Sequence, residues 1–473
     1  MSKVDTPSQS YENQFPIWKR CRDVIAGQDA VKNAGDIYLP KLSGQDLDEY
    51  EAYKARAKFY NASARTHEGM TGMIFRRPAE VTAPDNIEGL TNDVTMTGVS
   101  LSELATTIGS EVIAVGRVGV LVEHTVQPTD QLTEAQAKEY GLRPYMAVYK
   151  AEAILDYSKA GRDNKADVSM VRLMETHMKP DPEDEFQTTV EERIRVLDLD
   201  PVGYYRQRVF TKDDNGEWSQ SGDDIYPIMK GEKLTWIPFV FINPDNTDPK
   251  IVKPPLLDLI DLNLTHYRLS ADYYHGLHYT ALPTPVITGQ SKDSLEGIMK
   301  IGGSAAWVLP NKEAKATYLE FTGAGLSEIR IELANLRTEM ATQGMRILAA
   351  DPKGIESAET ANIHRAGENS VLAAMAGAIG TGLTIALTYL AEWGGMEWEK
   401  AVEECVVAIG TDYMPKGASS QMFAEWTKAY MMGAISFGDY VSKLKQWELI
   451  DANKSEEDIR TEIETMPPPG AGM

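Results

Sequence analysis

Cysteine is nearly absent from this chain. Only Cys21 and Cys405 occur in 473 residues, and they lie far apart in the sequence. Two distant cysteines cannot form the disulfide framework that small secreted domains use to compensate for a small core. Neither belongs to a C-x-x-C pair, which zinc and dithiol redox sites commonly use. The sequence therefore predicts a protein that folds in a reducing compartment such as a cytoplasm.

Basic charge is also scarce. The chain has 47 Lys and Arg residues against 70 Asp and Glu residues, which gives a formal net charge of −23 at pH 7 and a pI near 4.8. A protein that grips nucleic acid by neutralising phosphates needs clustered Lys and Arg, so this class is disfavoured. An acidic surface is compatible with a protein past which DNA slides, although most acidic residues simply solvate a protein's exterior.

Motifs for catalysis and cofactor binding are missing too. The chain has no G-x-x-x-x-G-K-[ST] loop and no H-E-x-x-H pair. Gly377, Gly380 and Gly382 lie inside an apolar stretch rather than after a strand, so they do not match a dinucleotide-binding turn. His275 and His278 are flanked by tyrosines, which favours an aromatic helix face over a metal site. We therefore expect no enzyme, metal or cofactor, and an enzyme in the α/β region remains an alternative without a supporting motif.

One run of the sequence, residues 369–391 (NSVLAAMAGAIGTGLTIALTYLA), carries no charged side chain. It is long enough to cross a bilayer as a helix, which needs about 20 apolar residues. Its Gly, Ala and Thr residues suit close packing against protein, and its flanking charges give no orientation signal. We expect a helix buried in a soluble assembly. The alternative is a membrane-associated oligomeric pore that uses residues 369–391.

The order of predicted elements indicates an α+β chain that is mostly helical. An N-terminal helical part is followed by a β-rich part, 116–242, in which Asn215-Gly216 predicts a hairpin turn. A helix then starts near Pro254, followed by a β-type insert at 286–321 with Ala306 to Leu309 as a strand. The predicted helices are 16–34, 47–73, 100–115, 326–348, 357–393, 420–432, 436–447 and 456–465, with a strand at 403–409.

Together with this order, four short segments resemble the portal proteins of tailed bacteriophages, the head-tail connector family. The segments are YKARAKFYN at 53–61, GMIFRRP at 72–78, GRVGVLV at 116–122 and IPFV at 237–240. The resemblance extends over about residues 12–465. These motifs are structural, and none is catalytic.

The resemblance implies a ring of identical subunits, usually twelve, around a channel for double-stranded DNA at one vertex of the virion capsid. Its other implied partners are the terminase large subunit, a head-completion or adaptor protein, and the major capsid and scaffolding proteins, with no membrane. Assembly would occur in the host cytoplasm. The implied regions are the wing (1–252), a stem helix (253–285), the clip (286–325), a second stem helix (326–348), a channel loop (349–360), a long wing helix and strand (361–411), and a helical crown with its tail (412–473).

The same resemblance gives candidate site residues. In a ring, each inward-facing charge is repeated around the axis, so one side chain becomes a ring of charge. Three residues are candidates for the surface that faces DNA, and three glycines are candidates for close subunit packing. The DNA-facing candidates are Arg346, Asp351 and Lys353, and the packing candidates are Gly377, Gly380 and Gly382.

Overall fold

The computed structural model describes residues 4–125, 141–162, 165–181, 184, 186–213, 215–281, 284–289, 311–319, 323–348, 358–411, 420–447, 449–450 and 454–465. The chain divides into two compact units, Met1–Ile409 and Gly410–Met473. Helices make up 48% of the residues and strands 22%, which confirms the expected α+β class with more helix than strand.

The first helix, α1 (Gln9–Ala26), begins earlier than its predicted start at Pro16. The Ser8 side chain caps α1 by accepting a hydrogen bond from the backbone N–H of Tyr11, so Pro16 lies inside the helix. An internal proline costs about 3 kcal/mol. Burial of residues such as Trp18, which is 0% exposed, offsets this cost. Gly27, at φ +104°, then separates α1 from α2 (Gln28–Asn33), so the predicted single helix to residue 34 is wrong.

The predicted helix 47–73 is also interrupted. The structure has α3 (Leu47–Arg56) and α4 (Ala62–Ile74) instead. Asn61 caps α4 by accepting a hydrogen bond from the backbone N–H of Ala64, and Asn263 accepts hydrogen bonds from the first N–H groups of α4. A helix continuing through this point would have used those N–H groups internally. The break therefore follows from a contact distant in sequence.

Helix α6 (Leu101–Val115) agrees with its prediction. Ser100 and Glu103 form a complete capping box, and Gly116 ends the helix in the left-handed conformation at φ +77°. Residues that include Ile108 and Val112 are 0% exposed, so α6 lies in the core. Three short elements precede it: β1 (Glu80–Thr82), α5 (Asp85–Glu88) and a 3-10 turn at Gly89–Asn92.

Two larger antiparallel sheets follow. One has the order β11-β2-β3 and the other the order β4-β5-β6-β7-β8. Gly216, at φ +79°, lies in the turn between β7 and β8, which confirms the hairpin predicted at Asn215-Gly216. The strands are β2 (Val118–His124), β3 (Pro144–Lys150), β4 (Ile154–Arg162), β5 (Lys165–Pro180), β6 (Thr188–Leu199), β7 (Tyr205–Lys212), β8 (Trp218–Gln220), the small pair β9 (Ile228–Met229) and β10 (Glu232–Lys233), and β11 (Phe239–Ile242).

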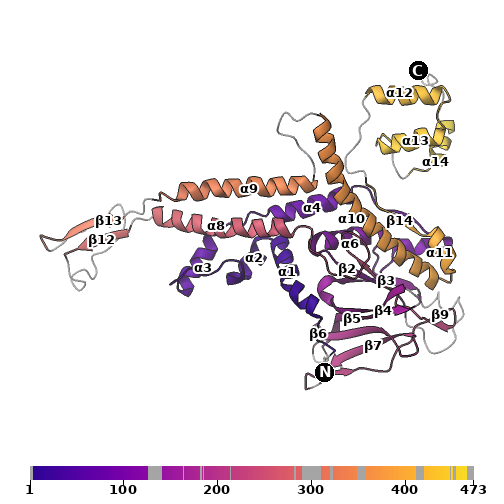
Figure 1. Cartoon of the computed structure of the whole chain (residues 1–473), viewed down its shortest axis with the longest axis horizontal. Coiled ribbons are helices and arrows are strands. Elements are labelled where there is room, and N and C mark those ends of the chain that lie inside the picture. Colours follow the sequence, from indigo (N-terminus) through magenta and orange to yellow (C-terminus); the bar gives the residue numbers. More distant parts are fainter. Residues whose placement is uncertain are drawn as a thin grey trace. The chain divides into compact units, whose positions relative to one another are not determined.

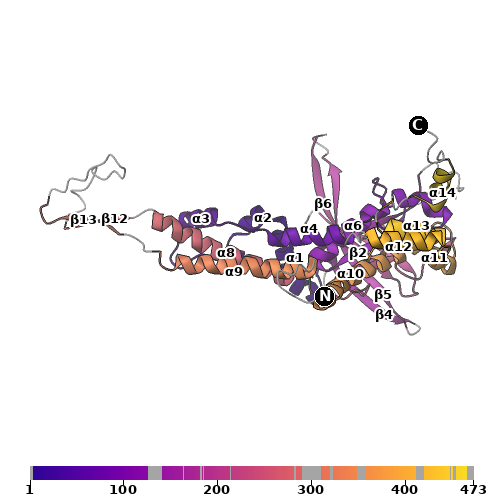
Figure 2. The ribbon, with the colours of Figure 1, turned by 90° about the horizontal axis from the view of Figure 1, so that it is seen from above.

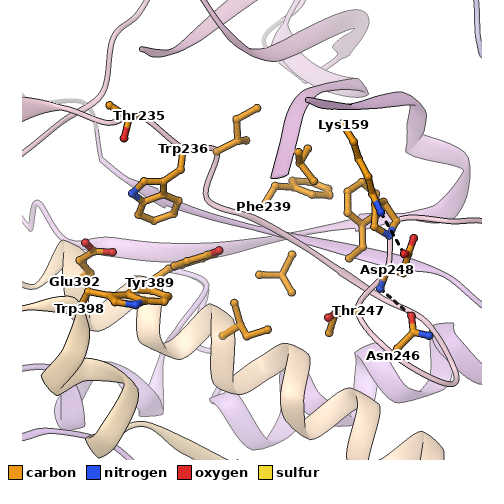
Figure 3. Close-up of a pocket in the computed structure, with 16 residues that line it drawn as sticks. Lys159, Thr235, Trp236, Phe239, Asn246, Thr247, Asp248, Tyr389, Glu392 and Trp398 are labelled. Atoms are coloured by element: carbon orange, nitrogen blue, oxygen red, sulfur yellow. Dashed lines mark hydrogen bonds and ion pairs between the residues drawn. The ribbon is translucent and has the colours of Figure 1, made fainter. Parts of the chain in front are cut away.

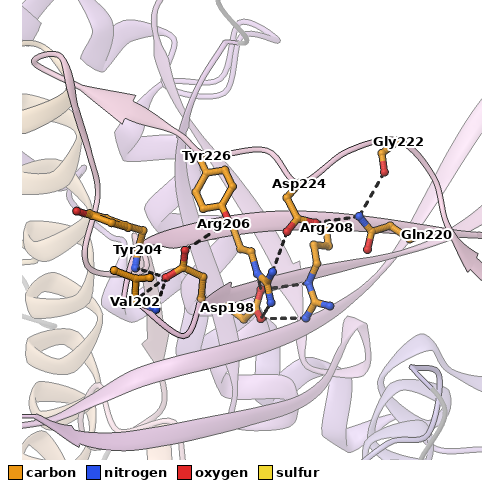
Figure 4. A network of polar contacts seen from close by, with 11 residues as sticks. Asp198, Val202, Tyr204, Arg206, Arg208, Gln220, Gly222, Asp224 and Tyr226 are labelled. Atoms are coloured by element: carbon orange, nitrogen blue, oxygen red, sulfur yellow. Dashed lines mark hydrogen bonds and ion pairs between the residues drawn. The ribbon is translucent and has the colours of Figure 1, made fainter.

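A polar network organises one face of the five-stranded sheet (Figure 4). The carboxylate of Asp198, on β6, accepts hydrogen bonds from both Arg206 and Arg208 on β7. Arg206 also donates to Asp224, which accepts a second hydrogen bond from Gln220. Asp198 is only 9% exposed, and buried carboxylates need such paired donors. The network joins two strands to the segment that follows β8.

The remainder of the first unit is built from long helices (Figure 1). Helices α8 (Leu257–Ala281) and α9 (Leu326–Leu348) lie side by side in Figure 1 and in Figure 2. The segment that connects them in the sequence contains the strands β12 (Thr284–Thr288) and β13 (Lys315–Leu319), which pair with each other. The predicted strand from Ala306 to Leu309 falls outside the described residues. Helix α9 has the bounds predicted for it, 326–348.

Helix α10 (Ala358–Trp393) packs against β2, β11, β14 and α6. Figure 2 shows α10 beside β2 and α6. It is followed by α11 (Trp398–Glu404) and β14 (Val406–Ala408), which pairs with β1. The strand predicted at 403–409 begins only at Val406, because Glu403 and Glu404 are the last two residues of α11.

The second unit contains the three helices predicted for the C-terminal part. They are α12 (Ser420–Met431), α13 (Phe437–Gln446) and α14 (Glu456–Thr465). Ser436 caps α13, and the Ser455 hydroxyl accepts a hydrogen bond from the Asp458 N–H at the start of α14. Aromatic contacts such as Trp426 with Trp447, at 5.9 Å between ring centroids, pack α12 against the end of α13.

Candidate functional site

The α8–α9 pair is fixed to the rest of the first unit by a buried asparagine. Asn263, on α8, is 0% exposed. Its Oδ1 accepts hydrogen bonds from the backbone N–H groups of Ala62 and Ser63 and from the Ser63 hydroxyl, while its Nδ2 donates to the carbonyl of Tyr60. A single side chain therefore satisfies the start of α4 and the carbonyl just before it. This contact sets where α8 crosses the N-terminal helices.

A second polar contact joins α8 to α9. The Nε of Arg337 donates a hydrogen bond of 3.2 Å to Nε2 of His266, which is 1% exposed. Tyr60 packs beside the His266 ring at 5.8 Å between centroids, and the Arg337 guanidinium lies over the Tyr60 ring at 5.3 Å. Burial, followed by the nearby positive charge of Arg337, lowers the pKa of His266 to about 4. The imidazole is thus held neutral at neutral pH.

This pKa predicts a pH dependence of stability. The unfolded chain takes up the His266 proton near pH 6.5, whereas the folded chain resists it until about pH 4. The unfolded state therefore binds more protons between these values, and stability is lost as the pH falls through this window. For this residue alone we expect a loss of about 2 kcal/mol between about pH 7 and pH 5. Urea titrations of the wild type and His266→Gln at several pH values measure it.

In His266→Gln, the free energy of unfolding should fall by about 2 kcal/mol less than in the wild type between about pH 7 and pH 5. His177→Gln, which changes an exposed histidine on β5, is the matched control and should keep the wild-type slope. An unchanged slope in His266→Gln would contradict a buried neutral imidazole.

Two glycines permit close helix contacts, one between α9 and α4 and one within the α8–α9 pair. A Cβ atom at Gly344 of α9 would lie 2.8 Å from the Thr66 hydroxyl of α4, and one at Gly276 of α8 would lie 2.8 Å from Leu326 of α9. Both glycines therefore permit approaches that a larger residue would prevent.

Helix α9 buries only one side. Leu333, Leu336 and Met340, all members of the predicted apolar seam, are at most 6% exposed. Ile331, on another side of α9, is 51% exposed, and most of its helical neighbours are exposed as well. Within the described residues, α9 thus presents a long accessible surface that the chain itself does not cover.

The three charged candidates fall at the end of α9 and beyond it. Arg346 is in the last turn of α9, two residues before its end at Leu348. Asp351 and Lys353 lie outside the described residues, so their part of the prediction stays a prediction.

The three candidate glycines have different surroundings on α10. A Cβ at Gly380 would lie 2.8 Å from the backbone oxygen of Val407 in β14, and one at Gly382 would lie 2.5 Å from Ile242 in β11. A Cβ at Gly377 would meet nothing within 4 Å. Gly380 and Gly382 are therefore closely packed within the chain, whereas Gly377 faces the exposed side of the helix.

The uncharged run is largely a core helix of the first unit. Residues 371–393 are long and apolar enough to span a membrane, with a mean hydropathy of 1.8, but 61% of the tested segment is buried inside the chain. Ile379, Leu383 and Leu387 are each 0% exposed. Core helices of soluble proteins have this character. The run therefore packs against the sheet strands and α6.

An aromatic groove adjoins the same helix (Figure 3). It has a volume of about 1060 Å³ and lies between α10, the start of α11, β11 and the loop 246–249. Trp236 stacks near Tyr389 at 4.4 Å between centroids, and Tyr389 lies 5.8 Å from Trp398. Sequence reasoning missed these residues because they come from three separate elements. No local spacing links them.

No metal centre is evident. Among the described residues, no group of three or more His, Cys, Asp or Glu side chains is arranged to hold a metal ion. His275 stacks edge-on against Tyr279 at 4.9 Å and against Tyr53 at 5.1 Å, as the aromatic interpretation of this helix face predicted.

Comparisons with known proteins gave one family match and several structural similarities. A family model described as a domain of unknown function, DUF4055, matches residues 255–394, which include α8, α9 and α10. A comparison with curated proteins found no match. A chain from the virion of a native gene transfer agent particle is similar with 11% identity and a TM-score of 0.37, covering 86% of this chain and 96% of that chain. A chain from the neck of an empty gene transfer agent particle is similar with 11% identity and a TM-score of 0.35, covering 91% of this chain and 96% of that chain.

Proposed function

We propose that this chain is a portal protein: a subunit of a ring at one capsid vertex whose channel carries double-stranded DNA during packaging and ejection. The observation that carries the proposal is the sequence of elements in the first unit. A mixed helix and sheet region leads into α8, then into the β12–β13 pair, then back through α9 and into the long helix α10. The sequence motifs resemble the portal family at four points within this order.

The surface of α9 supports the ring. Its exposed side is not covered by any described residue of this chain, which leaves it open to contact with a neighbouring subunit. In the proposed ring, α8 and α9 are the stem helices, β12 and β13 belong to the clip, α10 is the long wing helix, and the second unit is the crown.

The net charge of −23 supports a channel through which DNA moves rather than one that holds it. A dense basic lining would bind the duplex tightly through phosphate contacts, whereas sparse contacts permit sliding. We propose Arg346, Asp351 and Lys353 as positions near DNA. The subunit would hydrolyse nothing itself, and the terminase large subunit would dock on the clip during packaging, before a head-completion or adaptor protein.

Among the candidate glycines, we propose Gly377 as a contact with a neighbouring subunit. It shares the exposed side of α10 with Val371, Ala374 and Thr381. These residues are uncharged and, except for Val371, small, so a neighbouring helix could approach closely there. The close contacts of Gly380 and Gly382 lie within the chain.

Imaging of the purified full-length chain tests the function. Expressed without detergent, the protein should form rings of about twelve subunits with a central channel wide enough for duplex DNA. Negative-stain microscopy gives the ring and its symmetry, and native mass spectrometry gives the subunit number. A protein that remains monomeric at micromolar concentration would contradict the proposal.

The same experiment distinguishes the soluble ring from the alternative of a membrane-associated pore, which rests on the length and composition of residues 371–393. A membrane pore would enter the membrane fraction and need detergent for extraction. The burial of this helix favours the soluble ring.

A further inference from the structure

The groove beside α10 contains a row of aromatic rings. Trp236, Tyr389 and Trp398 come from the loop before β11, from α10 and from the first residue of α11 (Figure 3). Successive rings are tilted by 33° and 31° to one another. Trp398 is 40% exposed, which leaves its ring accessible from solvent. Faces of Trp and Tyr rings attract cations, Trp most strongly.

A carboxylate with one unsatisfied oxygen lies beside this row. Glu392 is one helical turn after Tyr389, and both residues line the groove. Its Oε2 atom is buried and makes no hydrogen bond to any described residue. The nearby Lys230 donates its hydrogen bonds to Glu397 and to the Met396 carbonyl instead.

The electrostatic surroundings of Glu392 favour a positive ligand. Burial is the main cause that raises the pKa of Glu392; the positive charge of Lys230 lowers this pKa, and the negative charges of Glu397 and Glu399 raise it. A bound cation would give the Oε2 atom the direct partner that it lacks among the described residues. A half-buried carboxylate next to accessible aromatic faces is thus complementary to an organic cation.

We propose that this groove binds an arginine side chain of an extended peptide, with the guanidinium stacked on the aromatic row and hydrogen-bonded to Glu392. Arginine fits better than lysine because its planar fork can stack on a ring and bond a carboxylate at the same time. This inference is independent of ring assembly, since it rests on the groove of a single chain.

The shape of the groove favours a peptide over a small free cation. Pockets for small ligands enclose most of the ligand surface, whereas this groove is open at Trp398. Beyond the aromatic row the groove continues along Ile237, Phe239 and Phe241 to an ion pair between Lys159 and Asp248, 3.2 Å apart. This apolar stretch can take a hydrophobic residue next to the arginine.

The test compares two peptides that differ only in charge. Acetyl-Val-Arg-Val-amide and its citrulline analogue, in which an uncharged urea replaces the guanidinium, are titrated into the full-length protein by isothermal calorimetry. We expect the arginine peptide to bind at least about tenfold more tightly than the citrulline peptide, and its affinity to fall as salt is added.

Three variants assign the binding to the groove. Glu392→Gln keeps the shape of the side chain and should lower the affinity for the arginine peptide at least about tenfold. Trp398→Ala should also weaken it, and Trp398→Phe should restore part of the loss because a ring face is regained. Glu403→Gln, which neutralises an exposed carboxylate of α11 outside the groove, is the matched control and should bind as the wild type does.

Several results would overturn the inference. These are no binding of the arginine peptide at millimolar concentration, equal affinity for the citrulline peptide, or unchanged affinity in Glu392→Gln with wild-type circular dichroism. Arginine amide alone binding as tightly as the peptide would overturn the assignment to a peptide.

Discussion

Asn263→Leu should lower the free energy of unfolding by about 4 kcal/mol, the largest single-residue effect that we expect in this protein. Asn263 is 0% exposed and makes four hydrogen bonds to Tyr60, Ala62 and Ser63. Leucine branches at the same atom but is larger and has no polar atoms, so the Ser63 N–H and hydroxyl would be buried without their Asn263 partner. Each such group costs about 1 to 3 kcal/mol.

The measurement is urea-induced unfolding of the full-length chain, followed by circular dichroism and tryptophan fluorescence. The matched control is Asn335→Leu on α9, because Asn335 is exposed and its side chain bonds, among the described residues, only to the neighbouring Glu332. We expect that control to remain within about 0.5 kcal/mol of the wild type. A small effect of Asn263→Leu would mean that apolar packing alone places α8 against α4.

Gly380→Leu should destabilise the first unit by about 3 kcal/mol or more. A Cβ at this position would lie 2.8 Å from the backbone oxygen of Val407, and a backbone atom cannot rotate away as a side chain can. The new side chain would force α10 away from β14. It would also stretch the hydrogen bond of 2.9 Å that the Val407 N–H donates to the Thr384 hydroxyl.

Gly377→Leu is the matched control for folding, since it is the same substitution one turn earlier on α10. A Cβ there meets no described atom within 4 Å, and leucine favours a helix over glycine by up to about 1 kcal/mol. Thermal unfolding of the unassembled protein should therefore show Gly377→Leu at least as stable as the wild type and Gly380→Leu clearly less stable. Equal stabilities would contradict the contact between α10 and β14.

The same pair of variants separates folding from assembly. If Gly377 contacts a neighbouring subunit, Gly377→Leu should fold normally and yet form rings poorly. Native mass spectrometry would show monomers or incomplete rings. If Gly377→Leu forms normal rings, Gly377 does not belong to the subunit interface. That result would not affect the portal proposal itself, which the imaging experiment tests.

Local signals in the sequence were sufficient for several elements. Ser100, Glu103 and Gly116 specify both ends of α6, because a capping box and a left-handed glycine satisfy helix termini without distant partners. The bounds of α9 and the β7–β8 hairpin at Asn215-Gly216 were also predictable, since they depend on apolar spacing and on turn residues.

Other boundaries depend on contacts that the sequence does not display. The break between α3 and α4 occurs where Asn263, some 200 residues away, accepts hydrogen bonds from Ala62 and Ser63. Pro16 is tolerated within α1 because tertiary packing buries Trp18, Cys21 and Val24 on one side of that helix. In both places a distant partner outweighs the local preference.

The sequence by itself determined the α+β class, the order of the long helices, the lack of catalytic motifs and the acidic charge, because these follow from composition and short-range periodicity. Only the tertiary structure decided which side of α10 is buried, which glycines are closely packed, and that Trp236, Tyr389 and Trp398 meet beside Glu392, whose Oε2 has no partner among the described residues. Periodicity records which residues share one element. Packing between elements decides what those residues contact, and that depends on partners far away in the chain.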